Sequence, residues 1–97
     1  MISNSTFSGN TAVRGGAVFI GGHAVPTFID CVFNYNHANT FGGAVSISEY
    51  SNTSFTNCTL FKNSADSETG SGFYGNGNSF GVFENCKFTY VACTYCI

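Results

Sequence analysis

The sequence predicts an all-β fold, a right-handed parallel β-helix of about 3.5 turns with about 27 residues in each turn. Three observations predict it. A short pattern of apolar, Asn and Gly residues recurs with a nearly constant period. Long runs of the helix formers Ala, Leu, Glu and Lys are absent, whereas 12 of the 97 residues are glycine. Short β-branched and aromatic runs alternate with Asn and Gly, as in strands that are joined by tight bends.

Each repeat has an apolar anchor that is followed three positions later by Asn and five positions later by Ala. The anchors Phe7, Phe33 and Leu60, and Phe88 of a decayed fourth copy, are 26, 27 and 28 residues apart. A second set of apolar residues lies five positions before the anchors and comprises Ile2, Phe28, Phe55 and Phe83. Since each turn of a solenoid buries its apolar face against the next turn, we expect both sets to form interior columns.

The repeats run approximately over residues 2–27, 28–54, 55–82 and 83–97, so residues 1–97 are interpreted as a single β-helix segment. The pattern is already present at residue 2 and is still present at residue 88. Terminal turns of a solenoid need capping elements, and neither end has a pattern typical of one. We therefore expect this segment to be part of a longer solenoid.

Asn or Asp is the third residue of each segment that joins the two apolar columns: Asn4, Asp30, Asn57 and Asn85. Phe28 and Phe33 are five residues apart, an odd step that would place them on opposite faces of a straight strand. Asn and Asp tolerate the left-handed backbone conformation. We therefore expect a bend at Asp30 and its equivalents, which turns both aromatic side chains inward.

The remaining parts of each repeat predict a second corner and a further strand. Asn10, Asn36 and Asn63 are expected to mark the second corner. The Gly-Gly-Ala-Val element at residues 15–18 recurs at 42–45 and, as Gly-Ser-Gly-Phe, at 70–73. It is expected to begin the next strand, with its inward side chains at Val18, Ile20, Val45 and Ile47. Each turn is then predicted to have three short strands and three bends.

Three of the five cysteines, Cys31, Cys58 and Cys86, occupy one repeat position, which Ser5 fills in the first turn. Successive turns hold equivalent side chains about 4.8 Å apart, beyond the roughly 3.5 to 4.5 Å between Cβ atoms that a disulfide needs. We expect a column of reduced, inward thiols. Cys93 and Cys96 have the spacing of a redox motif or half a zinc site, but no second ligand pair accompanies them. No metal site is expected.

Composition argues against several classes of function. Charged residues make up 8% of the chain and the formal net charge is -2, so no basic surface for nucleic acid is predicted. No segment is apolar for the roughly 18 residues that a membrane-spanning helix needs, and direct membrane insertion is not expected. Residues 70–75 match a dinucleotide-binding glycine pattern, but a polar loop follows instead of a helix. We therefore expect no cofactor.

Charged and titratable residues do not form an evident catalytic pattern. The acids are Asp30, Glu49, Asp66, Glu68 and Glu84, and the bases and histidines are Arg14, Lys62, Lys87, His23 and His37. They occupy different repeat positions, whereas glycosidase chemistry needs paired carboxylates. We expect no catalytic residue and no enzymatic activity. Asn4, Asn52 and Asn57 begin Asn-x-Ser/Thr sequons, which are glycosylation acceptors in a eukaryotic secretory pathway.

The pairing of a Phe-x-x-Asn element with a Gly-Gly-Ala-Val element resembles the repeats of chlamydial polymorphic outer membrane proteins. Residues 7–10 with 15–18, and 33–36 with 42–45, match both elements, and residues 60–63 with 70–73 match in part. The resemblance implies an exported passenger segment that is displayed at the cell surface and serves adhesion. Its partner would be a host-cell receptor or a neighbouring chain. The alternatives are a fragment of a carbohydrate-active β-helix enzyme and a purely structural remnant.

Overall fold

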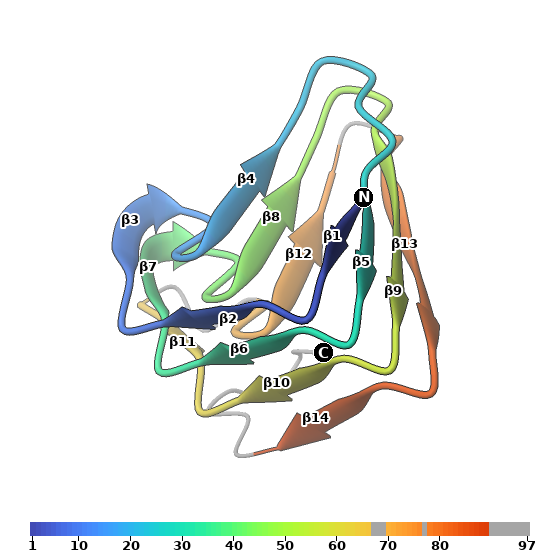
Figure 1. Ribbon diagram of the computed structural model, residues 1–97. Helices are drawn as coiled ribbons and strands as arrows, with labels where there is room; N and C mark the ends of the chain where they lie inside the picture. Colours follow the sequence, from blue (N-terminus) through green and yellow to red (C-terminus); the bar gives the residue numbers. More distant parts are fainter. Residues whose placement is uncertain (67–69, 77, 90–97) are drawn as a thin grey trace.

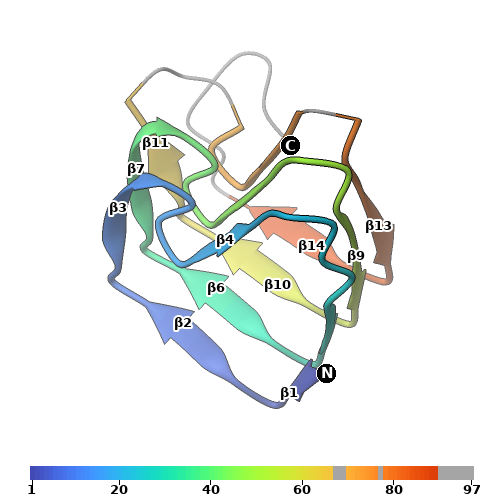
Figure 2. The ribbon, with the colours of Figure 1, turned by 90° about the horizontal axis from the view of Figure 1, so that it is seen from above.

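The computed structural model of the protein describes residues 1–66, 70–76 and 78–89. Throughout these residues the chain winds into stacked turns, and the strands of one turn pair in parallel with those of the next (Figure 1). Seen from above, the strands surround a common interior (Figure 2). The principal extents are 27 × 27 × 20 Å, so this segment is about as broad as it is long. The predicted parallel β-solenoid is confirmed.

The described strands form four parallel sheets, one on each side of the coil. The first sheet contains β1 (Ile2–Ser3), β5 (Thr27–Ile29), β9 (Asn52–Thr56) and β13 (Phe80–Glu84). The second contains β2 (Thr6–Ser8), β6 (Val32–Asn34), β10 (Thr59–Phe61) and β14 (Lys87–Thr89). The third contains β3 (Thr11–Arg14), β7 (His37–Phe41) and β11 (Ser64–Ala65). The fourth contains β4 (Val18–Ile20), β8 (Val45–Ile47) and β12 (Phe73–Gly75).

The prediction of three strands per turn was wrong, because a full turn has four. The additional strand is that of the third sheet, between the Asn corner and the glycine pair. Its residues include Thr11–Arg14 in the first turn and the longer His37–Phe41 in the second. The register shifts between Ala12 and Arg14, so the repeat is irregular there. Pairing with the neighbouring turns makes this segment a strand, and a strict internal pattern does not mark it.

The first corner is formed as predicted. Asn4, Asp30, Asn57 and Asn85 all have positive φ, between 51° and 56°. The bend separates the first sheet from the second, so Phe28 and Phe33 both face inward and are fully buried. The main-chain N–H of Asp30 donates to the carbonyl oxygen of Thr56 at 2.9 Å, which ties this corner to the turn below. A local backbone preference thus directs both apolar columns into one core.

The second corner lies one residue earlier than predicted. The residues with positive φ there are Gly9 (68°), Tyr35 (57°) and Lys62 (54°), each of which precedes the expected Asn. Asn36 and Asn63 are instead buried, with exposed fractions of 1% and 4%. Since a bend leaves main-chain donors and acceptors unpaired on its inner side, a side-chain amide placed inside the corner can satisfy them.

The buried asparagines form a hydrogen-bonded ladder along the inside of this corner. The Nδ2 of Asn36 donates to the Oδ1 of Asn63 at 3.0 Å and to the carbonyl oxygen of Phe7 at 2.9 Å. The Oδ1 of Asn36 accepts from the main-chain N–H of Asn10 at 3.0 Å. Asn63 repeats this arrangement one turn below, where its Nδ2 donates to the carbonyl oxygen of Phe33 at 2.9 Å. The Asn of the repeat therefore links adjacent turns.

Replacement of Asn36 by Ala should destabilise the protein by about 2 to 3 kcal/mol, because it leaves buried main-chain and amide groups without partners. The matched control is Asn39→Ala, three residues further on in β7, since Asn39 is exposed and its replacement should change the free energy of unfolding by no more than about 0.5 kcal/mol. Urea melts of the two variants give the comparison. Equal losses would show that the ladder adds nothing to stability.

The glycine pair forms the third corner. Gly15, Gly42 and Gly70 have positive φ, between 58° and 73°. The second glycine of the pair allows close approach: a Cβ on Gly16 would lie 2.2 Å from the carbonyl oxygen of Gly43, and one on Gly43 would lie 2.1 Å from that of Ser71. The pair thus serves two needs, since its first residue makes the bend and its second removes the side chain where two turns meet.

The interior contains the predicted apolar columns, except that Ile2 in the first turn is 37% exposed. Phe7, Phe33, Leu60 and Phe88 are in register in the second sheet, and Ile2, Phe28, Phe55 and Phe83 in the first. The rings of Phe28 and Phe55 stack at 5.1 Å between centroids. Phe28 and Phe33 meet edge to face at 5.6 Å, which joins the two columns. Val45 and Ile47 face them from the fourth sheet, fully buried as predicted.

Two repeat positions in the fourth sheet show compensation of volume between turns. Phe73 pairs with Val45 and Gly75 with Ile47, so the third turn has a larger and then a smaller residue than the second. A Cβ on Gly75 would lie 3.5 Å from the ring of Phe73, and one on Gly81 would lie 2.8 Å from it. The ring of Phe73 thus fills space that both glycines leave. This accounts for Phe73 at the position that Val45 has in the second repeat.

Candidate functional site

The repeating cysteines form the inward column that the sequence predicts. Cys31, Cys58 and Cys86 are free thiols, and the first two are 1% exposed. Each thiol donates to carbonyl oxygens of the first corner, as in Cys58, whose Sγ lies 3.6 Å from the oxygen of Phe28 and 3.4 Å from that of Thr56. Burial raises the pKa of the Cys58 thiol above its ordinary value of 9.0. A raised pKa opposes thiolate chemistry at Cys58, whose thiol instead packs inside the coil. Cys93 and Cys96 lie outside the described residues.

Alkylation should separate these thiols by burial. In the folded protein Cys58 should react much more slowly with iodoacetamide than the half-buried Cys86, because its thiolate is scarce and shielded. After denaturation without reductant, both should react fully. Mass spectrometry of each peptide measures the alkylation rates, and equal rates for Cys58 and Cys86 in the folded protein would contradict burial.

The raised pKa of Cys58 also predicts how stability depends on pH. Because this pKa is raised on folding, the stabilisation linked to the Cys58 thiol should be present below pH 9.0 and lost at more alkaline pH.

Among the described residues, the structure does not gather the predicted acids into a paired site. Asp30 lies at the first corner, and Glu84 is exposed at the end of β13. Glu49 lies at a separate bend, where its Oε1 accepts from the main-chain N–H of Gly22 at 3.0 Å. Asp66 contacts His37. Glu68 lies outside the described residues.

Other sequence motifs prove to be parts of the coil. Gly70 makes the third corner and β12 follows it, so residues 70–75 carry a strand where a dinucleotide site needs a helix. Within residues 1–66, 70–76 and 78–89, no three His, Cys, Asp or Glu side chains are grouped to hold a metal ion. Over the same residues no helix is long and apolar enough to cross a membrane. The sequon residues Asn4, Asn52 and Asn57 are all exposed.

Two aromatic clusters lie on the outside of the coil, and each contains a cation. In the corner cluster, made of Tyr35, Phe61 and Lys62, the two rings meet edge to face at 5.7 Å and the Nζ of Lys62 lies 5.4 Å from the ring centroid of Phe61. In the edge ladder, made of Arg14, Phe41 and Tyr74, the rings stack at 4.1 Å and the guanidinium of Arg14 lies 5.4 Å from the ring of Phe41. Such clusters combine apolar area with hydrogen-bonding groups, as binding hot spots do.

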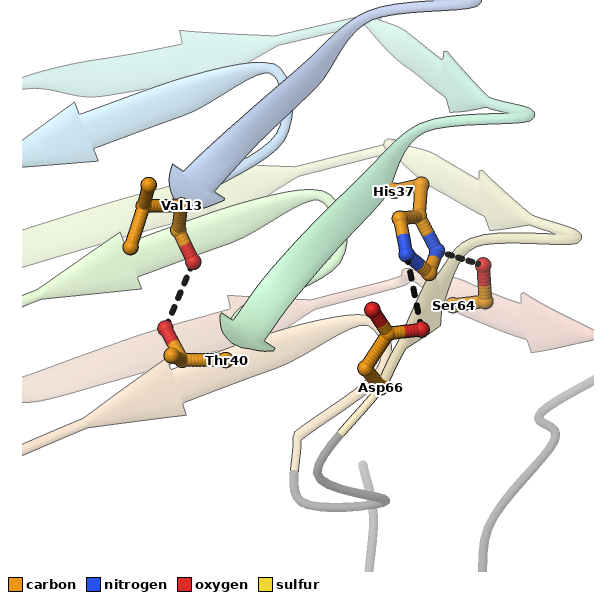
Figure 3. Close-up of polar contacts among 5 residues, drawn as sticks. All are labelled: Val13, His37, Thr40, Ser64 and Asp66. Carbon is orange, nitrogen blue, oxygen red and sulfur yellow. Dashed lines mark hydrogen bonds and ion pairs between the residues drawn. The ribbon is translucent and has the colours of Figure 1, made fainter.

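A polar cluster on the third sheet was not predicted (Figure 3). The Nδ1 of His37 lies 2.7 Å from the Oγ of Ser64, and its Nε2 lies 3.0 Å from the Oδ1 of Asp66. Nearby, Thr40 donates from its hydroxyl to the carbonyl oxygen of Val13 in the turn above. The sequence held a usable signal, because His37 and Ser64 directly follow the repeat residues Asn36 and Asn63 and so share one repeat position.

Comparison with known proteins defines the class. The chain matches the family model described as the right-handed β-helix region over residues 1–97, and it belongs to that family. The predicted fold class is thereby confirmed, including its handedness. The family includes both enzymes and non-enzymes, so membership defines the fold and no single activity. No curated protein and no solved structure matches the chain.

Proposed function

We propose that this chain is a segment of an exported, surface-displayed β-helix that binds a receptor or a neighbouring chain and does not degrade polysaccharides. The resemblance to the repeats of chlamydial polymorphic outer membrane proteins supports display as an adhesive passenger. Both shared elements have a structural role in this coil, since the Asn links turns at the second corner and the glycine pair forms the third. Extracellular location at an outer membrane is part of this proposal.

The observation that carries the proposal is the chemical composition of the outer surface, which has few charges and two clusters of aromatic rings with a cation. Charge is scarce there, and the two cations that lie over aromatic rings belong to clusters suited to contact with a partner. Tyr35 of the corner cluster is 53% exposed, with Phe61 and Lys62 beside it. Tyrosine is enriched among residues that dominate binding energy at interfaces. The corner cluster is therefore the proposed contact point.

The test uses the whole chain in a cell-binding assay, together with depolymerisation assays on pectin, alginate and glycosaminoglycans. We expect saturable binding and no depolymerisation. Tyr35→Asn should weaken binding about tenfold, since loss of a hot-spot side chain costs more than about 1 kcal/mol. Asn suits the left-handed backbone at φ 57°, so the bend is kept.

Tyr50→Asn is the matched control, because Tyr50 is 59% exposed and has a φ of 60° but lies at another bend, stacked on His23. Binding by this variant should match that of the unaltered chain. Equal loss in both variants would contradict a contact at the corner cluster. Depolymerisation that disappears in Glu49→Gln or Glu84→Gln would overturn the proposal in favour of a carbohydrate-active enzyme.

A further inference from the structure

The cluster of His37, Ser64 and Asp66 is formed by two successive turns of the third sheet. His37 is the first residue of β7, Ser64 is the first residue of β11, and the two are register partners. Asp66 is two residues beyond Ser64, and its main-chain N–H donates to the carbonyl oxygen of Ala38 at 3.0 Å. Asp66 lies in the turn directly after β11, and its carboxylate lies 3.0 Å from the Nε2 of His37, so it is on the side of the sheet that carries Ser64.

Asp66 determines which nitrogen of His37 carries the proton. An ionised carboxylate only accepts hydrogen bonds, so the Nε2 that lies 3.0 Å from Asp66 must be the protonated nitrogen of the neutral ring. The Nδ1 is then an acceptor, and the partner at 2.7 Å is the hydroxyl of Ser64, which donates to it. The order of hydroxyl, imidazole and carboxylate is that of a catalytic triad, but the ring nitrogens are exchanged, since here Nδ1 faces the serine and Nε2 faces the carboxylate.

We propose that Ser64 is an acyl acceptor, with His37 as its general base and Asp66 as a positioning residue. The Oγ of Ser64 attacks the carbonyl carbon of a small activated ester while its proton passes to the Nδ1 of His37. The C–O bond to the leaving alcohol then breaks, and the alcohol takes this proton from His37. Water, activated by the same nitrogen, later cleaves the acyl-serine bond to release the acid and restore the Ser64 hydroxyl.

The solvent exposure of the cluster determines how large a rate acceleration we expect. The side chains of His37 and Asp66 are 33% and 64% exposed, and Ser64 between them is half-buried, so a small ester can approach the cluster from solvent. General base catalysis contributes about 10² to 10⁴ in rate. Since water reaches this cluster and screens its charges, we expect an acceleration near the lower end, about 10²-fold. This activity is separate from partner binding at the corner cluster, which involves other residues.

The experiment treats the whole chain with p-nitrophenyl acetate and measures both p-nitrophenol release and the sites of acetylation by peptide mass mapping. Ser64 should be acetylated about 10²-fold faster than Ser54, a half-buried strand serine elsewhere on the coil. Ser64→Ala should remove the fast release, and His37→Gln should lower it about 10²-fold. Ser64→Cys keeps a nucleophilic atom at that position and should remain acylated.

Asp66→Asn tests the positioning role, because it should slow acetylation of Ser64 while the melting temperature stays the same. His23→Gln is the control for simple catalysis by an exposed imidazole and should leave the rate unchanged, since His23 stacks on Tyr50 at another bend. Equal acetylation of Ser64 and Ser54 would overturn the proposal. So would ester cleavage that persists in Ser64→Ala but is lost in His37→Gln, since the imidazole would then act without the serine.

Discussion

Phe33→Ala should lower the free energy of unfolding by about 3 to 5 kcal/mol, the usual range for loss of a buried Phe. Phe33 is fully buried, stacks on Phe7 at 4.8 Å between centroids and meets Phe28 and Phe55 edge to face. Truncation removes these contacts and leaves a cavity where two apolar columns meet. Urea melts analysed by linear extrapolation measure the loss.

Phe80→Ala is the matched control, since it makes the same chemical change at a ring that is 57% exposed. It should change stability by about 0.5 kcal/mol or less. Phe33→Leu keeps the experiment measurable if the Ala variant does not fold, because Leu60 fills the same position one turn below. The free energy of unfolding of the Phe33→Leu variant should be lower by about 1 kcal/mol. Similar losses in Phe33→Ala and Phe80→Ala would contradict the assignment of inside and outside.

Gly43→Ala should destabilise the protein by about 3 kcal/mol, the upper part of the usual range for overpacking. A Cβ there would lie 2.1 Å from the carbonyl oxygen of Ser71 and 2.4 Å from that of Ser64, both of the turn below. Backbone atoms cannot rotate away as a flexible side chain can, so the two turns must separate. The hydrogen bond from the N–H of Gly43 to the carbonyl oxygen of Gly70, at 3.1 Å, should then weaken.

Gly22→Ala separates this clash from backbone strain. Gly22 has a φ of 68°, but no atom lies within 4 Å of a Cβ built on it. Strain at a left-handed residue costs roughly 1 to 2 kcal/mol, so Gly22→Ala should cost less than Gly43→Ala. Hydrogen exchange should show faster exchange at the amides of Gly43 and Val45 in the Gly43 variant. Unchanged exchange there, with stability equal to that of the unaltered chain, would contradict close approach of the turns.

The sequence alone determined the features that each repeat encodes in a few neighbouring residues. The period, the two apolar columns and the bend at Asp30 follow from residue type and spacing, because a left-handed bend is a local preference of Asn and Asp. The inward direction of Cys58 follows as well, since it is one residue past a bend. These predictions rested on single-turn geometry, and the structure confirms them.

Only the tertiary structure decided the features that depend on which atoms of adjacent turns meet. The inner position of Asn36 reflects main-chain groups of the turns above and below that need partners. The third sheet exists because Thr11–Arg14 and its equivalents pair across turns, although their own pattern is irregular. The contact of His37 with Ser64 likewise joins residues 27 positions apart that only stacking brings together. Local preference defines one turn of this coil, whereas contacts between turns bring together side chains such as His37 and Ser64.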